Sequence, residues 1–334
     1  MKVDGGIDWD LSKAGAQARE LEEMGYSGIL SAETNHDPFF PLVVAAQNTE
    51  RLELMTSIAV AFARSPMILA NIGHDLNAAS HGRFILGLGS QIRPHIQKRF
   101  SMPWSSPAAR MREFILAMRA IWANWHTGED LAFTGKFYTH TLMTPMFTPT
   151  NSDFGAPRVF LAAVGPKMTE VAGEVADGIL IHAFTTEKYL RETTLPALER
   201  GFEKAGKRRE DFQITYPAFI VTGQTEEEMA EQKKLVCKQI AFYGSTPAYK
   251  PVLESIDAGD LQGELNTMSK QGRWDEMGTL IDDSLLGQFA VVAEPAALAD
   301  QMLSRYGDIV DRTSAAYSNL AKEDRRDIVR RLTA

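Results

Sequence analysis

Four side chains that can donate or accept a proton stand at or just after the ends of apolar segments: Glu33, His36, His95 and His182. A carboxylate at the position of Glu33 is either a general acid or base, or an anchor for a neighbouring backbone N–H group. Each histidine is either a proton-transfer group, since imidazole titrates near neutral pH, or a structural residue with satisfied hydrogen bonds. These four residues are the candidates for catalysis.

The segment from Ala162 to Gly178, AAVGPKMTEVAGEVADG, predicts an anion-binding site. An apolar strand ends in Ala-Ala-Val-Gly, and a helix begins at once with Pro166 in its first turn. The free N–H groups and the positive end of the helix dipole favour a phosphate there. Lys167 and Thr169 could add hydrogen-bond donors. The alternative is an ordinary helix start that binds nothing.

A second glycine-rich segment, GLGSQI, runs from Gly87 to Ile92. It lacks the third glycine of a dinucleotide-binding fingerprint, and no strand ending in Asp or Glu follows about 20 residues later. It is more typical of a strand end next to a ligand, where glycine lets a flat ring approach the backbone. A tight strand exit is the alternative.

Metal and thiol chemistry find no support in the sequence. The seven histidines form no H-x-H or H-E-x-x-H pair, so we expect no metal site. The single cysteine, Cys237, lies on a predicted helix without an obvious base, and one cysteine rules out an intrachain disulfide.

The elements that must position these residues alternate regularly between a short apolar strand and a helical segment. Such alternation predicts a parallel sheet covered by helices, and eight repeats predict a closed (β/α)8 TIM barrel with its chemistry at the C-terminal ends of the strands. The expected strands are KVDGGI from Lys2, GILSAE from Gly28, LELMTSIAV from Leu52, RFILGLGS from Arg83, RVFLAAVG from Arg158, DGILIHAF from Asp177, FQITYPAFIV from Phe212 and GQFAVVAE from Gly287.

Insertions are expected after strands 4 and 7, at 91–106 and 127–157 around the fourth helix and at 240–286. Part of the 127–157 segment, GEDLAFTGKFYTHTLMTPMF, predicts a hairpin or an extended loop. No linker or repeat interrupts the chain, so residues 1–334 are expected to form one domain. Aromatic and methionine side chains in the insertions either line a fairly apolar substrate site or pack the loops onto the barrel: Trp104, Phe137, Tyr138, Met143, Met146, Phe147 and Trp274.

Composition narrows the class of protein. The net charge of −8, from 35 basic and 43 acidic residues without a dense basic run, argues against nucleic acid as a partner. The first residues, MKVDGGIDWD, contain no apolar signal segment, and no apolar run approaches the roughly 20 residues that span a membrane. We therefore expect a cytoplasmic enzyme that is not bound to a membrane.

The sequence resembles the bacterial luciferase-like flavin monooxygenase superfamily, and within it the branch that uses the deazaflavin coenzyme F-420. The resemblance covers nearly the whole chain and is strongest from Thr49 to Ser90 and from Val159 to Leu180. Its most specific pattern is L-x-T-x-(I/V), then R-x-P, then (S/H)-G-R-F-x-L-G-L-G.

The resemblance implies roles for particular residues. The family's third strand holds a bulge with a non-proline cis peptide that backs the flavin-type ring, and the matching bond is Ser57–Ile58. The matching segment after the fourth strand lines the cofactor, and the backbone at 163–165 holds its ribityl or phosphate portion. Together with the donors of the anion site, the implied cofactor-binding residues are Ser57, Ile58, Gly89, Ser90, His95, Ala163, Val164, Gly165, Lys167 and Thr169.

Two departures from the family's sugar-phosphate dehydrogenases bear on the substrate. Those enzymes carry Asp-His at the end of the second strand, where this chain has Glu33-Thr34 with His36 two residues later. Their glutamate after the fourth strand is replaced by Ile92. A sugar phosphate is therefore not the expected substrate.

The resemblance implies an F-420-dependent oxidoreductase that transfers a hydride between the deazaflavin and a small, fairly apolar organic molecule. The alternatives are an FMN-dependent monooxygenase that uses reduced flavin and O2, and a member without catalytic activity. A homodimer is also expected, because barrels of this family commonly pair through the second and third helices, whose sequences PLVVAAQ and MILANIG are apolar. Burial against the protein's own barrel would explain the same residues.

Overall fold

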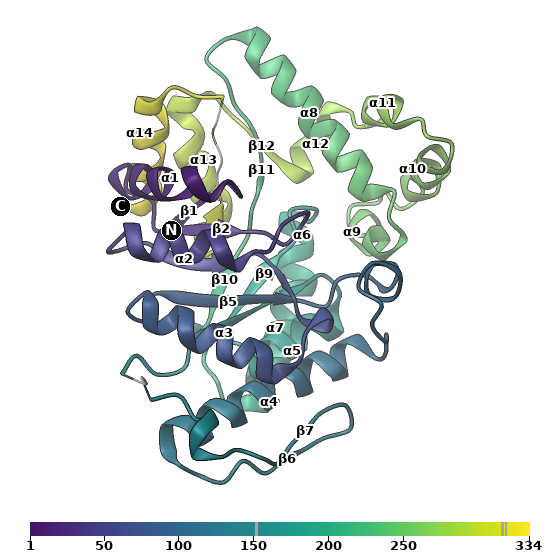
Figure 1. The fold of residues 1–334 in the computed structure, drawn as a ribbon. Coiled ribbons are helices and arrows are strands. Elements are labelled where there is room, and N and C mark those ends of the chain that lie inside the picture. The colour runs from purple at the N-terminus through teal and green to yellow at the C-terminus, as the bar shows by residue number, and fades with distance from the viewer. Residues whose placement is uncertain (151–152, 315–316, 318) are drawn as a thin grey trace.

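A computed structural model describes residues 1–150, 153–314, 317 and 319–334. Eight parallel strands lie in the order β3-β2-β1-β13-β10-β9-β8-β5, and pairing of β3 with β5 closes them into a barrel (Figure 1). The expected TIM barrel is thus confirmed. Its strands are β1 (Lys2–Gly6), β2 (Gly28–Ser31), β3 (Glu53–Thr56), β5 (Phe84–Gly89), β8 (Arg158–Ala163), β9 (Gly178–Ile181), β10 (Gln213–Thr215) and β13 (Arg312–Ser314).

The eighth barrel strand is not the predicted one. The segment from Gly287 begins as the end of helix α12 (Asp283–Phe289) and continues as β12 (Ala290–Val292), which pairs with β11 (Phe219–Val221) in a separate two-stranded sheet. The barrel is completed by β13, whose sequence Arg-Thr-Ser contains no apolar run. In place of an apolar side chain, β13 directs Arg312 into the barrel interior, where it forms ion pairs. Hydrophobic pattern therefore could not find it.

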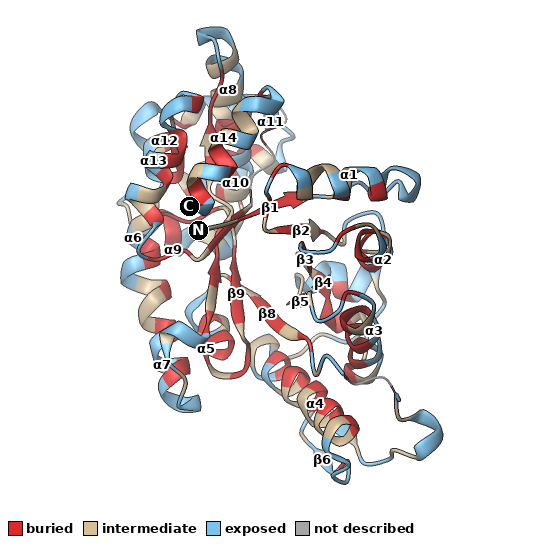
Figure 2. Ribbon diagram, turned by 90° about the vertical axis from the view of Figure 1, so that its left-hand side faces the viewer, coloured by how far each residue is buried: buried red, intermediate tan, exposed pale blue. Residues whose placement is uncertain are grey.

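Helices cover the outside of the barrel, with their buried faces toward the strands (Figure 2). Several start where capping residues predict. Asp10 accepts a hydrogen bond from the Ser12 N–H at 3.0 Å, and Ser65 accepts one from the Ile68 N–H at 3.3 Å. The main covering helices are α1 (Leu11–Glu23), α2 (Phe39–Asn48), α3 (Pro66–Ala79), α4 (Pro107–Thr127), α5 (Pro166–Val175), α6 (Glu187–Tyr189), α7 (Leu195–Ala205), α13 (Pro295–Tyr306) and α14 (Lys322–Thr333).

The insertion after α4 contains the predicted hairpin, formed by β6 (Phe133–Thr134) and β7 (Thr139–His140). The Glu113 carboxylate of α4 holds it in place by accepting hydrogen bonds from three successive N–H groups, at 136, 137 and 138, over 2.6–3.0 Å. Residues 151–152 of this insertion lie outside the described residues.

The insertion between β10 and β13, which we call the second insertion, is mostly helical. Its apolar side chains, including Ile240, Leu265 and Phe289, form a cluster with Phe184 and Tyr189, which follow β9. The second insertion projects beyond the barrel (green in Figure 1). Besides α12, its helices are α8 (Glu226–Gly244), α9 (Lys250–Glu254), α10 (Leu261–Lys270) and α11 (Trp274–Met277). Among the described residues, no helix combines the length and apolar composition that crossing a bilayer requires.

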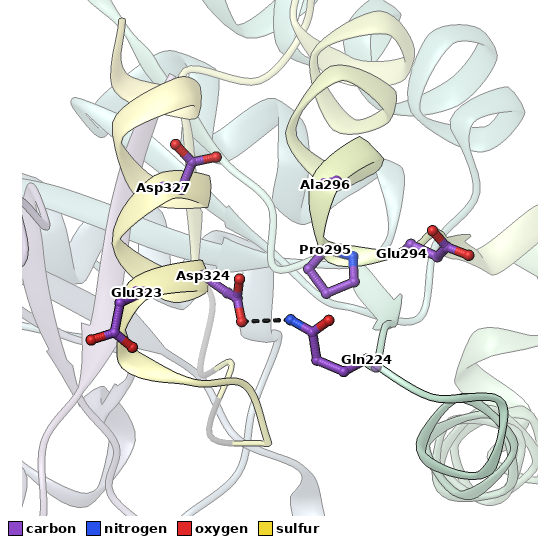
Figure 3. A pocket seen from close by; sticks show the side chains of 8 residues that line it. Gln224, Glu294, Pro295, Ala296, Glu323, Asp324 and Asp327 are labelled. Carbon is purple, nitrogen blue, oxygen red and sulfur yellow. Dashed lines mark hydrogen bonds between the residues drawn. The ribbon is translucent and has the colours of Figure 1, made fainter.

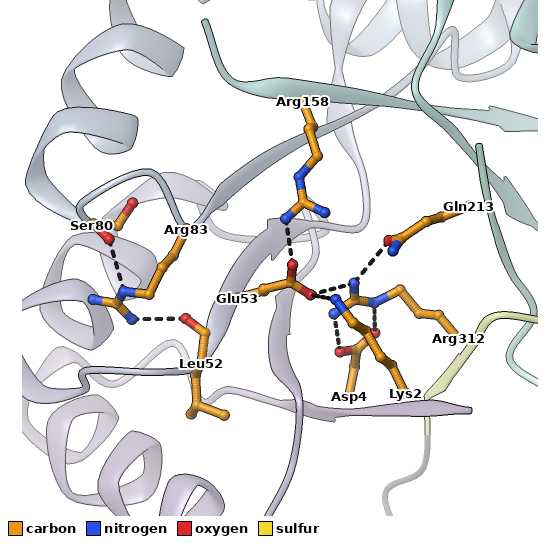
Figure 4. A network of polar contacts seen from close by, with 9 residues as sticks. All are labelled: Lys2, Asp4, Leu52, Glu53, Ser80, Arg83, Arg158, Gln213 and Arg312. Carbon is orange, nitrogen blue, oxygen red and sulfur yellow. Dashed lines mark hydrogen bonds and ion pairs between the residues drawn. The ribbon is translucent and has the colours of Figure 1, made fainter. Parts of the chain in front are cut away.

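The N-terminal end of the barrel interior is closed by ion pairs (Figure 4). The Arg312 guanidinium is fully buried and donates to both Asp4 oxygens at 2.7 Å and to Glu53 at 2.6 Å. Burial alone would raise the pKa of Glu53, but the charges of Arg312, Lys2 and Arg158 lower it to about 2. Lys2, Glu53, Arg158 and Arg312 are the first residues of their strands, and Asp4 is the third residue of β1. The network therefore stabilises the end opposite the expected chemistry.

Candidate functional site

The barrel mouth is built around a bulge at the end of β3. The peptide bond between Ser57 and Ile58 is cis, as the resemblance implies, and the chain then resumes as the short strand β4 (Ala59–Val60) beside β5. The Ser57 N–H donates to the Ser31 carbonyl at 2.7 Å, which ties the bulge to β2. Ser57 and Ile58 remain partly exposed, so they can form the floor of a ligand site.

Glu33 clamps the far side of this bulge. Its carboxylate accepts hydrogen bonds from the Val60 N–H and the Arg64 guanidinium, both at 2.7 Å, and its side chain is only 7% exposed. The backbone N–H of Glu33 also donates to the Ile58 carbonyl at 3.1 Å. Of the two roles open to Glu33, this geometry favours the anchor over the acid or base.

The glycines of β5 make room for the bulge itself. A Cβ atom on Gly87 would lie 1.8 Å from the Thr56 carbonyl oxygen, and one on Gly89 would lie 2.7 Å from the Ile58 side chain. The Thr56 hydroxyl donates to the Gly87 carbonyl at 2.8 Å and accepts from its N–H at 2.9 Å. The close approach that requires glycine is therefore that of the protein's own backbone, where the sequence suggested a ligand ring.

The predicted anion site lies at the start of α5, which follows β8, and β5 lies between β8 and the bulge. Gly165 precedes the helix, is exposed, and has open space where a Cβ would be. Lys167 is exposed as well. Pro166 has no N–H group and the Met168 N–H donates to the Gly165 carbonyl at 3.1 Å, so the Lys167 N–H is the donor that remains for a ligand at this helix start. Thr169 differs from expectation, because it is buried and its hydroxyl donates to the Gly165 carbonyl at 3.1 Å.

His182 follows β9 directly and is covered by the second insertion. Its ring stacks on Tyr249 at 4.9 Å and meets the edge of Tyr243 at 4.6 Å between centroids. The Phe184 N–H donates to Nδ1 at 3.0 Å, so the neutral ring carries its proton on Nε2. Burial lowers the pKa of His182 to about 4. The residue therefore fits a fixed hydrogen-bond donor better than a proton-transfer group at neutral pH.

This burial predicts a pH effect on stability. Because the pKa of His182 falls from its ordinary 6.5 to about 4, the unfolded chain binds more protons than the folded protein between these values. The free energy of unfolding should then decrease as the pH falls from 7 to 5, with about 1–2 kcal/mol due to His182. Urea unfolding of wild type and His182→Asn at pH 5 and 7 measures the difference. An equal decrease in the free energy of unfolding of the two proteins between pH 7 and 5 would contradict it.

The other two candidate histidines lie at the surface of the mouth. His36 is exposed and its ring stacks on Trp9, with 5.2 Å between centroids. His95 is exposed at the start of a π-helical turn, His95–Arg99, in the loop after β5. Both are free to meet a ligand, and their catalytic role stays a prediction.

A small cavity joins the predicted cofactor loop to His182. Ala163, Val164, His182 and Thr185 line it, and it has room for about one water molecule. Thr185 is buried and its hydroxyl has no hydrogen-bond partner among the described residues. A polar ligand atom at this position would satisfy that hydroxyl.

A larger hollow lies elsewhere, at the starts of α13 and α14 (Figure 3). The carboxylates of Glu294, Glu323, Asp324 and Asp327 line it, and Gln224 donates to Asp324 at 2.6 Å. Because these charges repel phosphate, the hollow does not suit an anionic cofactor. Over the described part of the chain, no three His, Cys, Asp or Glu side chains gather closely enough to hold a metal ion.

Three of the residues expected along a substrate wall contact side chains of the protein itself. Trp104 packs edge-on against buried Phe62, and the Tyr138 hydroxyl accepts a hydrogen bond from Arg110 at 2.8 Å. Trp274 lies against Phe242 on the outer part of the second insertion. For these three side chains, the structure favours loop packing over contact with a substrate.

Three residues of the site were missed from the sequence. Arg64 belongs to the quoted R-x-P pattern, and that pattern was the available signal for its pairing with Glu33. Tyr243 and Tyr249 reach His182 from more than 60 positions along the chain. Nothing in the local sequence indicates that contact.

A family model described as luciferase-like monooxygenase matches residues 4–312. The chain belongs to the luciferase-like monooxygenase family. Among its relatives in this family is an uncharacterised protein of Mycobacterium tuberculosis, 52% identical over 97% of this chain and 95% of that protein. A putative coenzyme F-420-dependent oxidoreductase of the same organism is 27% identical over 84% of each chain.

Solved structures share the fold of this luciferase-like chain. The coenzyme F-420-dependent tetrahydromethanopterin reductase from Methanopyrus kandleri aligns with a TM-score of 0.79 and 19% identity, over 98% of this chain and 97% of that one. The monooxygenase RslO1 from Streptomyces bottropensis aligns with a TM-score of 0.68 and 20% identity, over 99% and 97%. The same barrel thus occurs in proteins named for a deazaflavin and in one named as a monooxygenase.

Proposed function

We propose that this luciferase-like protein is an F-420-dependent oxidoreductase. The observation that carries the proposal is that the partly exposed Ser57–Ile58 bulge, which can support a flat ring, and the predicted anion site lie at the ends of nearby strands. The bulge at Ser57–Ile58 lies beside β5, and β5 pairs with β8, which ends at the start of α5. Two strand spacings separate them by roughly 10 Å, a span that suits a tricyclic ring joined to a phosphate through a ribityl chain.

Each part of the site would then have a task. The deazaflavin supplies hydride transfer when bound. Ser57 and Ile58 would support one face of its ring, and the side chain and backbone N–H of Lys167 at the start of α5 would hold the phosphate. His36 and His95 are exposed at the mouth and could exchange a proton with the substrate, whereas His182 would donate a hydrogen bond from Nε2.

The 27% identity with a putative F-420-dependent oxidoreductase supports the deazaflavin over FMN. The second candidate function is an FMN-dependent monooxygenase that uses reduced flavin and O2, and it is favoured by the name of the family and by the RslO1 likeness. Both cofactors offer a flat ring and a phosphate, so the site described above suits either. The choice between them requires a binding measurement.

A fluorescence titration of the purified protein with coenzyme F-420, and a parallel one with FMN, tests the proposal. We expect tight binding of the deazaflavin and weak binding of FMN. Lys167→Gln should weaken deazaflavin binding by about 3–10-fold, because one charge-assisted contact to the phosphate is lost. Tight binding of FMN alone would contradict the proposal and identify the monooxygenase. Binding of neither cofactor would contradict both.

We also propose that the protein is a homodimer that pairs through α2 and α3. These helices pack against each other and leave large apolar side chains exposed, with Phe40 at 63% and Ile68 at 51%. Burial in the protein's own core therefore does not account for them, and exposed apolar patches mark contact sites.

Light scattering should give about twice the 37.0 kDa chain mass for wild type and the single mass for Phe40→Glu/Ile68→Glu. Two charges at the centre of an apolar interface are expected to prevent pairing. Leu235→Glu, on exposed α8, is the matched control and should remain a dimer. A wild-type monomer at micromolar concentration would contradict the proposal.

A further inference from the structure

The loop after β5 lies in a stretch of sequence without carboxylates. The chain carries 43 Asp and Glu among 334 residues, yet residues 76–112 contain none. The same stretch holds six Arg and Lys residues: Arg83, Arg93, Lys98, Arg99, Arg110 and Arg112. In a chain with a net charge of −8, this is a marked local excess of positive charge.

Three of these cations have structural tasks. Arg83 donates to backbone carbonyls at the end of α2, including that of Thr49 at 2.9 Å. Arg110 is buried and donates to the Pro103 carbonyl at 2.7 Å, and Arg112 pairs with Glu174 at 2.6 Å. Their charges are therefore already used within the fold.

The other three form what we call the cationic turn: Arg93, Lys98 and Arg99, all exposed, in and beside the π-helical turn. Arg93 donates to the Gln97 amide oxygen at 2.8 Å, and Arg99 donates to the Thr34 carbonyl. Among the described residues, none of the three has an ion pair with a carboxylate. Three positive charges thus stand uncompensated on one exposed segment.

The cationic turn lies at the rim of the proposed cofactor site. It begins three residues after Ser90 at the C-terminal end of β5, which pairs with β8 at Leu88 and Leu161. The start of α5, the proposed phosphate site, follows β8 directly. Arg99 reaches across to the loop after β2, so the turn spans the edge of the mouth.

We infer that the cationic turn binds the carboxylates of the oligoglutamate tail that extends from the phosphate of coenzyme F-420. Cations spaced along an exposed segment match carboxylates spaced along a flexible tail, and such contacts need no deep pocket. FMN ends at its phosphate and has no such carboxylates. The inference rests on the proposed function. It names the cationic turn as the part of the protein that would distinguish coenzyme F-420 from FMN.

The test is a fluorescence titration at low and at moderate salt with three probes. These are coenzyme F-420, FMN, and the deazaflavin analogue of riboflavin, which lacks the phosphate and the glutamates and is called the tail-free analogue. The variant is Arg93→Gln/Lys98→Gln, which leaves Arg99 and its contact with Thr34 intact. Lys234→Gln/Lys270→Gln removes the same charge from exposed sites on the second insertion and serves as the control. Thermal unfolding checks that both variants are folded.

We expect the variant to bind coenzyme F-420 about 10-fold more weakly at low salt, and to lose most of the salt dependence of wild type. Binding of the tail-free analogue and of FMN should not change, and the control should match wild type. Unchanged binding of coenzyme F-420 by the variant would overturn the inference while the proposed function stands. An equal loss with the tail-free analogue would also overturn it, because the residues would then act on the ring site. Absence of deazaflavin binding by wild type would overturn both.

Discussion

Arg312→Met is expected to destabilise the protein by about 3–5 kcal/mol, because it leaves the Asp4 carboxylate buried in the barrel interior without its cation. Asp4 is fully buried and has both oxygens bonded to Arg312, and Glu53 shares the same guanidinium. Glu53 keeps its contacts with Lys2 and Arg158, so Asp4 is the carboxylate that loses its cation entirely and accounts for most of the loss. Methionine fills a similar volume, which limits the effect to charge.

Urea unfolding at pH 7 measures this loss. Arg208→Met is the matched control, since its ion pairs with Glu210 and Asp211 are exposed and screened by water, so their loss should change stability little. Adding Asp4→Asn to Arg312→Met should recover part of the stability, because the stranded charge is removed. Equal effects of the Arg312 and Arg208 substitutions would refute the role assigned to the network.

Gly87→Ala is expected to have an effect of similar size, about 3–5 kcal/mol, for a steric reason. The new Cβ would lie 1.8 Å from the Thr56 carbonyl oxygen, which is a backbone atom and cannot rotate away. Thr56 is itself fixed by two hydrogen bonds to Gly87. The strands must separate, and the bulge at Ser57–Ile58 must shift with them.

The control is Gly263→Ala in α10, where a Cβ would meet no atom within 4 Å. There alanine should be neutral or stabilise by up to about 1 kcal/mol, since it favours the helix. Urea unfolding compares the two, and cofactor titration of any folded Gly87→Ala protein reports on the bulge. Wild-type stability of Gly87→Ala would show that the packing of β3 against β5 is looser than described.

The parts of the fold with a local physical cause were predictable. Capping at Asp10 and Ser65, the strand-to-helix turn at Gly165 and the hairpin of the first insertion all follow from short sequence patterns. Strand β13 was missed because a buried ion pair replaces the apolar residues by which strands are recognised. The segment chosen instead, β12, is apolar because Ala290 packs in the cluster of the second insertion and Val291 in the main core.

The candidate site shows the same division. The sequence could place Glu33 and His182 at strand ends, but their partners decide what they do. Arg64 and the Val60 N–H hold Glu33, and Tyr243 and Tyr249 bury His182. These partners come from other elements, so neither a residue type nor its spacing could reveal them. The glycines of β5 were found for the wrong reason, since the atom that crowds them is the protein's own.

The separate core of the second insertion has a consequence for how such a protein can change. Helices α8–α12 share one apolar cluster that reaches the barrel at Phe184 and Tyr189, while the bulge, the glycines of β5 and the start of α5 are held by the barrel. Mutations in the outer part of the insertion can therefore accumulate without disturbing the bulge at Ser57–Ile58. Divergence within the family could then change which substrates enter the barrel mouth while the proposed cofactor site stays the same. Relatives with the same cofactor site therefore need not share a substrate.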